Sequence, residues 1–236
     1  MPRFAYDLHI HSCLSPCGDD AMTPPNIVNM AYIKGLDIIA ITDHNSAGNA
    51  RAAMTAAREL PLTVIAGMEL TTAEEIHVIC LFPDADSADR AGEELYALLP
   101  KVENRPEFFG RQLLMDEEEN VREEVSRLLS NAASLSYDGV REFAARFGGF
   151  CYPAHIDRDA NSVLSNFGML PEEPHFSALE VYRPDRFFSD AENAFYKERF
   201  HVLTSSDAHQ LGDISEREHF LELEAATFQA LRKALL

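Results

Sequence analysis

Histidine and carboxylate side chains recur in this sequence at the ends of short apolar runs. His9 and His11 end the first run, and because side chains in a strand repeat every second residue, both imidazoles lie on one face and can chelate a single ion. Comparable side chains follow four later runs, namely Asp43 with His44, Glu69, His155, and Asp207 with His209. Protein cores normally exclude imidazoles and carboxylates, so this recurrence predicts a shared metal site.

His77 differs from the other candidates because it precedes its apolar run, Val78–Phe82, instead of following it. We therefore expect it to enter the site from the opposite end of a strand or from an antiparallel strand. His175, His201 and His219 stand in loop-like or strand-starting contexts without carboxylate partners, and we interpret them as structural or surface residues.

The elements that must position these side chains are short apolar runs that alternate with amphipathic stretches. The runs that we interpret as strands cover residues 4–10, 36–42, 62–68, 77–82, 150–154, 179–182 and 202–205. Thr23 can cap a helix that begins at Pro24 and Pro25 and ends at Gly35. Further helices are predicted over residues 49–59, 87–98, 119–131, 137–147, 190–199 and 227–235. This alternation is typical of βα units around a largely parallel sheet, and in a βα barrel the strand ends converge on one mouth.

Length and composition favour one α/β domain over residues 1–236. The 236 residues are 46% hydrophobic, which is enough for a substantial core. The N-terminus lacks the apolar segment of a secretion signal and no run of about 18 apolar residues occurs, so we expect a cytoplasmic protein without a membrane partner. Cys13, Cys17, Cys80 and Cys151 are too sparse for a disulfide scaffold and are expected to be reduced thiols.

The formal net charge of −19 constrains the partner of this chain. Such a charge repels a polyanionic backbone, so we expect no long nucleic acid as a partner. A small phosphorylated substrate escapes this objection, because bound divalent ions become the largest local charges in a site. The sequence leaves the oligomeric state open.

Residues 101–135 interrupt the alternation of strands and helices. No strand pattern occurs there, and acidic residues cluster at 116–119 and at 123–124. We interpret this segment as a helical, solvated surface excursion, because runs of like charge are usually solvated. A lid over the site is the alternative interpretation.

The ordered motifs of the chain resemble those of the PHP (polymerase and histidinol phosphatase) superfamily. The resemblance rests on residues 7–12 (DLHIHS), 42–44 (TDH), 67–69 (GME), His77, 153–155 (PAH) and 206–209 (SDAH), and covers nearly the whole chain in order. It implies an α/β fold, a distorted (β/α)7 TIM-like barrel of the PHP type. It also implies a cofactor of three divalent metal ions, zinc first, with manganese or iron as alternatives.

The resemblance also implies a role for each candidate ligand. It places His9, His11, Glu69 and Asp207 on one metal. Glu69 then bridges to a second metal held by His77 and His155, while His44 and His209 bind the third. Asp43 would orient a ligand imidazole, and we count Glu69, Asp207 and Asp43 as the catalytic residues.

The chain departs from this pattern at position 17. Many relatives have a histidine or an aspartate five or six residues after the second histidine of the first motif, where it completes the shell of the third metal. Here the residue is Cys17, followed by Gly18 and Asp19. We expect the Cys17 thiolate to be the ligand, with the Asp19 carboxylate as the alternative.

These features predict a hydrolase that acts on phosphate ester bonds. We expect it to cleave a small phosphomonoester, such as a nucleotide, sugar or amino-alcohol phosphate, by attack of a hydroxide that bridges the metals. Arg158 and Arg183 follow predicted strands and are candidates for binding the substrate phosphate. No protein nucleophile is expected, since Cys151 lacks the arginine of a cysteine-phosphatase loop and Asp84 is better explained as a turn and helix cap.

Three alternatives to this function remain open. A metal-dependent amidohydrolase also uses two alternating histidines on a barrel strand, although none of the four lysines, Lys34, Lys101, Lys197 and Lys233, stands at a strand end where a binuclear amidohydrolase has its carboxylated lysine. An exonuclease acting on short oligonucleotides is the second alternative. A non-catalytic metal-binding PHP domain is the third, and lost ligands would be its sign.

Overall fold

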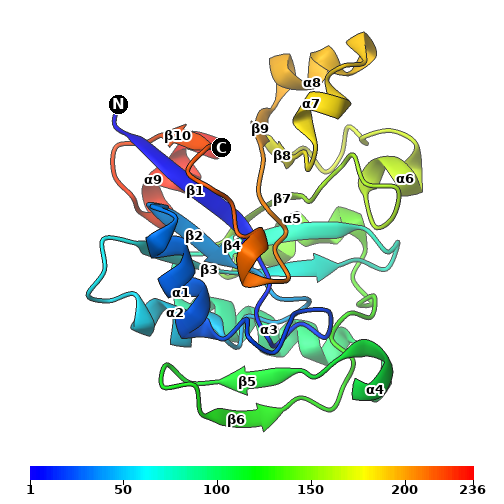
Figure 1. Ribbon diagram of the computed structural model, residues 1–236. Coiled ribbons are helices and arrows are strands. Elements are labelled where there is room, and N and C mark those ends of the chain that lie inside the picture. Colours follow the sequence, from blue (N-terminus) through cyan, green and yellow to red (C-terminus); the bar gives the residue numbers. More distant parts are fainter.

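The computed structural model describes residues 1–236 and is built around a curled sheet of six strands in the order β10-β1-β2-β3-β4-β7 (Figure 1). The strands are β1 (Arg3–Ile10), β2 (Ile38–Ile41), β3 (Thr63–Thr71), β4 (His77–Phe82), β7 (Phe150–Pro153) and β10 (Phe220–Glu222). β1, β2 and β3 pair in parallel, whereas β4 is antiparallel to both of its neighbours and β10 is antiparallel to β1. The predicted α/β fold is confirmed, but the sheet is mixed because β4 and β10 are reversed.

A parallel pair, β8 (Ala178–Glu180) and β9 (His201–Leu203), continues the curve beyond β7. The backbone N–H of Ile156, just after β7, donates to the carbonyl of Glu180 at 2.9 Å. The chain after β9 returns to β1, where Ala208 pairs with Ile10 in a parallel bridge. These links bend the structure into a half-barrel that is consistent with the distorted barrel that was expected.

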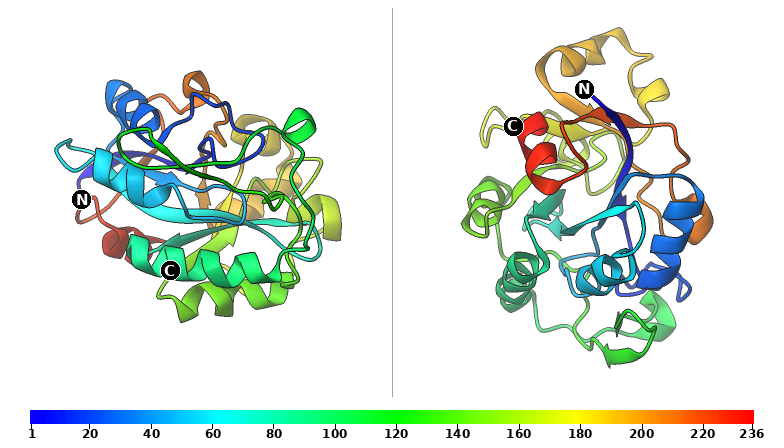
Figure 2. Two further views of the ribbon diagram at one scale, coloured as in Figure 1. Left: turned by 90° about the horizontal axis from the view of Figure 1, so that it is seen from below. Right: turned by 90° about the vertical axis from the view of Figure 1, so that its left-hand side faces the viewer.

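Four helices cover the outer face of the curled sheet (Figure 2). They are α1 (Pro24–Ile33), α2 (Ala50–Ala56), α3 (Ala85–Leu98) and α5 (Tyr137–Arg146). Thr23 caps α1 as predicted, because its side chain accepts from the backbone N–H of Asn26 at 3.3 Å. Asp84 caps α3 by accepting from the N–H of Ser87 at 2.7 Å, which is the role expected for this carboxylate.

Two hydrophobic clusters lie on the two faces of the sheet. The larger contains 42 buried residues and joins the sheet to the outer helices, while the smaller contains 16 and packs α9 (Phe228–Leu235) against the concave face. On β1, Tyr6 and Leu8 belong to the concave cluster but Ile10 belongs to the outer one. The register with β2 shifts between Asp7 and Ile10, which is the signature of a β-bulge. Because of this shift, the side chains at the end of β1, where the His-Ile-His sequence begins, change the face of the sheet to which they point.

The predicted helix at residues 119–131 is wrong. That segment contains a hairpin of β5 (Leu113–Met115) and β6 (Val121–Glu124), preceded by the short helix α4 (Pro106–Phe109), in the lower part of Figure 1. The turn of the hairpin is closed by Asp116, whose Oδ1 accepts from the backbone N–H groups of Glu118 and Asn120 at 3.0 and 2.8 Å. Turn chemistry therefore prevails over the helical spacing of the apolar residues.

The remaining elements lie between β7 and β10. They are α6 (Val163–Phe167), α7 (Pro184–Phe187), a 3-10 helix (Ala191–Asn193), α8 (Ala194–Arg199) and a second 3-10 helix (Leu211–Asp213). The predicted helix at 190–199 is thus split into a 3-10 turn and α8. None of the helices combines the length and the apolar character needed to cross a membrane.

Candidate metal centre

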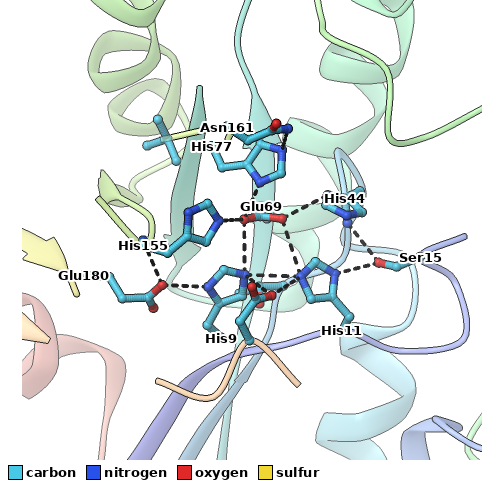
Figure 3. A network of polar contacts seen from close by, with 12 residues as sticks. His9, His11, Ser15, His44, Glu69, His77, His155, Asn161 and Glu180 are labelled. Atoms are coloured by element: carbon cyan, nitrogen blue, oxygen red, sulfur yellow. Dashed lines mark hydrogen bonds and ion pairs between the residues drawn. The ribbon is translucent and has the colours of Figure 1, made fainter. Parts of the chain in front are cut away.

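Glu69 in β3 lies at the centre of five imidazoles (Figure 3). The side chain is 1% exposed. Its Oε1 faces three ring nitrogens, at 2.8 Å from His77 Nδ1, 3.0 Å from His155 Nε2 and 3.3 Å from His9 Nε2. Its Oε2 faces two more, at 2.9 Å from His44 Nδ1 and 3.4 Å from His11 Nε2. One carboxylate therefore links most of the imidazoles that were singled out from the sequence.

The curl of the sheet explains why residues so far apart in sequence meet. His9 lies at the end of β1, His44 follows β2 and pairs with Glu69 in a parallel bridge, and His155 follows β7. β4 runs antiparallel to β3, and Thr71 pairs with His77. The first residue of β4 thus lies beside the last residues of β3, which confirms that His77 enters from an antiparallel strand.

The partners of His9, near the end of β1, and of His11, just after it, favour tautomers in which the outer ring nitrogen is the donor. His9 Nδ1 lies 2.9 Å from Glu180 Oε1, and a carboxylate can only accept. Ser15 donates its hydroxyl proton to Asp43 Oδ1 at 2.7 Å, so its oxygen accepts from His11 Nδ1 at 2.9 Å. In the neutral rings the two Nε2 atoms then carry lone pairs.

These two Nε2 atoms face each other at a distance of 3.2 Å, inside the cluster. Asp207 Oδ1 lies 3.3 Å from His9 Nε2 and 3.1 Å from His11 Nε2, and Glu69 lies on their other side. Buried lone pairs that face one another without a donor between them repel unless a cation or a proton lies among them. The donor set of two imidazole nitrogens and two carboxylates fits a divalent metal ion.

On the other side of Glu69, its Oε1 lies between His77 Nδ1 and His155 Nε2, at 2.8 and 3.0 Å. A group formed by His44, Glu69 and His77 also has ligand atoms within 4.8 Å of one another. Although His44 Nδ1 and Glu69 Oε2 are 2.9 Å apart, neither makes a hydrogen bond, and both are buried. A contact of this length between His44 Nδ1 and Glu69 Oε2, without the geometry of a hydrogen bond, fits two ligands of one metal ion better than a donor and its acceptor.

Cys17 joins the third group of ligand atoms, which also contains His11, His44 and His209, all within 4.8 Å of one another. Burial raises the pKa of the Cys17 thiol, but hydrogen bonds with His209 and His44 outweigh it and lower this pKa to about 6. Asp19 is exposed, as Cys17 is, but its Oδ1 is directed at its own loop, where it accepts from the N–H of Ala21 at 2.8 Å. The geometry therefore brings the thiol, and not the carboxylate of Asp19, to the third group.

The charges of the centre are mutually dependent. Burial raises the pKa of Glu69, but His77, His9 and His44 outweigh it and hold that pKa well below its usual range. Burial lowers the pKa of His9, but Glu180, Asp207 and Glu69 outweigh it and raise that pKa well above its usual range. The carboxylates thus require positive charge beside them, which divalent ions supply.

Two predicted ligands have backbone conformations in the left-handed region, with φ of 27° at His155 and 51° at Asp207. Such conformations are costly for these residue types and persist where the surrounding structure fixes them. Glu180 fixes one of them, because the backbone N–H of His155 donates to its Oε1 at 3.1 Å. Arg158 fixes the other by an ion pair of 2.6 Å between its Nη2 and Asp207 Oδ2.

The remaining predicted site residues divide into two kinds. Asp43 reaches no imidazole directly and acts through Ser12 and Ser15, whose hydroxyls donate to it at 2.6 and 2.7 Å. Arg158 borders the metal-site cleft, with its guanidinium 4.2 Å above the Tyr182 ring. Arg183 is exposed and borders only a neighbouring cleft, so the structure does not bring it to the metal cluster.

The cluster opens into a cleft of about 280 Å³. Its lining includes His44, His77, His155 and His209 together with Arg158. A second cleft of about 360 Å³ shares Arg158 and Asp159 with it. Arg158 therefore stands between the metal cluster and the space where the rest of a ligand would extend.

Three residues that were not predicted contact the outer nitrogens of ligand imidazoles. They are Glu180 on His9, Ser15 on His11, and Asn161, whose amide lies 2.8 Å from His77 Nε2. Partners of this kind orient a ligand ring and fix its tautomer. Glu180 carried a signal in the sequence, because a carboxylate between Leu179 and Val181 interrupts an apolar strand. Ser15 and Asn161 carried none.

Comparison with known proteins gives a family match and one curated relative of interest. Residues 7–164 match the PHP domain family. The chain is 33% identical to a 5'-3' exoribonuclease from Haemophilus influenzae over 97 residues, which are 40% of this chain and 32% of that protein. The aligned part thus spans about a third of the length of this relative.

Solved structures share the fold over nearly the whole chain. A lesion-specific endonuclease Q from Pyrococcus furiosus superposes with a TM-score of 0.71 at 19% identity, covering 99% of this chain and 56% of the endonuclease. A protein from Bifidobacterium adolescentis assigned to the metal-dependent phosphoesterases superposes with a TM-score of 0.64 at 18% identity, covering 99% and 96% of the two chains. At these identities the likeness concerns the fold.

Proposed function

Because the chain belongs to the PHP domain family, we propose that it is a metal-dependent phosphoesterase that releases phosphate from a small phosphomonoester, such as a nucleotide, sugar or amino-alcohol phosphate. The observation that carries the proposal is the buried Glu69 carboxylate with five imidazoles around it. Such a group is costly to bury unless it serves a bound ion.

Three ions are assigned to the ligand groups described above. His9, His11, Glu69 and Asp207 hold the first, and Glu69 with His77 and His155 holds the second. His44, His209 and Cys17 hold the third. Zinc suits these imidazole and thiolate donors best, and manganese or iron is the alternative.

Divalent ions bound at these positions would supply Lewis acidity toward the phosphate oxygens and would activate a water as the nucleophile for hydrolysis. The protein side chains provide the geometry. Glu69 fixes the separation of the first two positions, while Glu180 and Ser15 hold His9 and His11 in the tautomers with free Nε2 atoms. Arg158, at the rim of the cleft, binds a phosphate oxygen of the substrate.

The size of the cleft and the charge of the chain both favour a small substrate. A volume of about 280 Å³ suits a small organic phosphate. The net charge of −19 disfavours long nucleic acid. The similarity to an exoribonuclease favours a second candidate, the 5' end of a short oligonucleotide, which presents a phosphate to the cluster with its next nucleotide in the neighbouring cleft.

The proposed function is tested by a phosphate-release screen. Metal-replete protein is expected to release inorganic phosphate from one or more small phosphomonoesters, to lose this activity with a chelator, and to regain it when the metal is restored. Short 5'-phosphorylated oligonucleotides, amides and lactones belong in the same panel. Cleavage of amides or lactones with no phosphate release would identify an amidohydrolase, and an inert protein would identify a non-catalytic domain.

The third metal position is tested by exchanging its two candidate ligands. Cys17→Ser is expected to bind one ion fewer than the unaltered protein, because a neutral hydroxyl replaces a thiolate. Asp19→Ala is the matched control and is expected to keep every ion, since the Asp19 carboxylate is directed at its own loop and does not join the third group of ligand atoms. Metal content per chain gives the answer, and the reverse pattern would assign the position to Asp19.

A further inference from the structure

We propose that the segment of residues 101–131, which we call the arm, is a brace that holds the loop of residues 12–20 so that Cys17 can reach the third metal position. This inference rests on the proposed function, because it assumes that Cys17 is a ligand. It assigns a role to the part of the chain that was interpreted from the sequence as a solvated excursion. The arm lies at the bottom of Figure 1, beside the loop that follows β1.

The arm contacts the loop backbone directly at two points. The N–H of Leu113 donates to the carbonyl of Cys13 at 2.8 Å. Gly110 has a φ of 95°, and a β-carbon at this position would overlap the carbonyl oxygen of Pro16. Only glycine therefore permits the close approach of the arm to the residue before Cys17.

Asn49 fastens the arm and the loop to each other. Its side-chain amide donates to Ser12 Oγ and to the carbonyl of Leu113, both at 2.9 Å, and its Oδ1 accepts from the N–H of Met115 at 2.8 Å. Ser12 in turn donates to Asp43 at 2.6 Å. A continuous set of hydrogen bonds thus runs from β5 of the arm to the carboxylate that supports the metal centre.

The arm is stiff enough to act as a brace. The buried amide of Gln112 donates to the carbonyls of Val125 and Arg127 at 2.7 and 2.9 Å, and its Oε1 accepts from the N–H of Leu129 at 2.8 Å. These bonds join the two limbs of the arm. Beyond the loop, at the start of α1, Thr23 donates to Glu119 of the arm at 2.6 Å.

Cys17 is fixed from both sides by these contacts. On one side Pro16 lies against Gly110, and on the other the N–H of Asp19 donates to the carbonyl of His209 at 2.9 Å. The intervening Gly18 packs against the carbonyl of Ser12. Displacing the arm is therefore expected to move the thiol relative to His44 and His209, whereas the ligands of the first two metal positions lie outside the loop, which reaches them only through the contact of Ser15 with His11.

The experiment compares Gly110→Ala with Gly168→Ala. Gly168 also has a positive φ, of 75°, but a β-carbon there would meet nothing within 4 Å. Both substitutions place an alanine at a positive φ, with the larger backbone cost at Gly110, whose ψ of 170° lies in a region that essentially only glycine adopts, whereas Gly168 has a ψ of −10°. Only Gly110→Ala also pushes on the loop. Gly110→Ala is expected to bind two ions per chain, while Gly168→Ala and the unaltered protein bind three. Asn49→Ala removes the fastening without a clash and serves as a second variant if Gly110→Ala does not fold.

A metal-independent readout separates this inference from the proposed function. In metal-free protein, amide exchange at Gly18 and Asp19 is expected to be about tenfold faster or more in Gly110→Ala than in Gly168→Ala. If Cys17→Ser keeps all three ions, Cys17 is not a ligand of the third metal. The amide exchange rates of Gly18 and Asp19 then decide whether the arm holds the loop. Unchanged exchange, together with full metal content in Gly110→Ala or, failing that, Asn49→Ala, would overturn the inference.

Discussion

Replacing Glu69 by glutamine is expected to remove two of the three ions and nearly all phosphate release. Glu69 touches both the imidazoles assigned to the first position, His9 and His11, and those assigned to the second, His77 and His155. A neutral amide keeps the volume of the carboxylate but brings an NH2 donor toward ring nitrogens that must present lone pairs to an ion. We expect kcat/KM to fall by about 10³-fold or more, which corresponds to about 4 kcal/mol of lost transition-state stabilisation.

The matched control for this change is Arg183→Gln. Arg183 is an exposed side chain that lies outside the metal cleft, so its replacement is expected to leave the metal content intact and to cost far less activity. Metal content per chain and kcat/KM for phosphate release are measured on both variants. Equal losses in the two variants, or full metal content in Glu69→Gln, would contradict the bridging role of Glu69.

Where the information was local, the sequence predicted which candidate side chains lie together. His9 and His11 alternate at the end of a strand, and this period alone places both imidazoles on one face. Glu69 was expected after its strand but lies within β3, which extends to Thr71. This difference of two residues in the end of β3 does not change the position of Glu69, because its side chain still lies at the end of the half-barrel where the other candidate ligands meet.

Contacts between distant segments were not predictable from one sequence. Glu180 is separated from His9 by 171 residues, and nothing near either residue specifies their pairing. In the arm, Val121, Val125, Leu128 and Leu129 have helical spacing, yet the Asp116 turn folds the segment back as a hairpin. The proposed role of the arm could not be predicted from the sequence for the same reason. The hydrogen bonds that join the arm to the loop come from Asn49, which lies at the start of α2, far from the arm in the sequence.

Removing the metals is expected to lower the thermal unfolding midpoint by about 15–30 °C. An ion at a free concentration of about 100 times its Kd stabilises the folded state by about 2.7 kcal/mol, and three ions together by about 8 kcal/mol. For a chain of this size, 1 kcal/mol shifts the midpoint by about 2–4 °C. The shift is large here because the ligands come from all parts of the chain, from β1 to the segment after β9, so that the unfolded chain cannot assemble them.

The same measurement on Glu69→Gln tests whether stability and ligation share one origin. If Glu69 holds two ions, the difference between metal-free and metal-replete midpoints should shrink to about a third of that of the unaltered protein, because only the third ion still contributes. Arg183→Gln should retain the full difference. A metal-free protein that unfolds at the same temperature as the loaded one would mean that the ions bind a preformed site too weakly to be resident. The burial of Glu69 among five imidazoles argues against that outcome, since removing the ions leaves its charge to be balanced by protons on the rings.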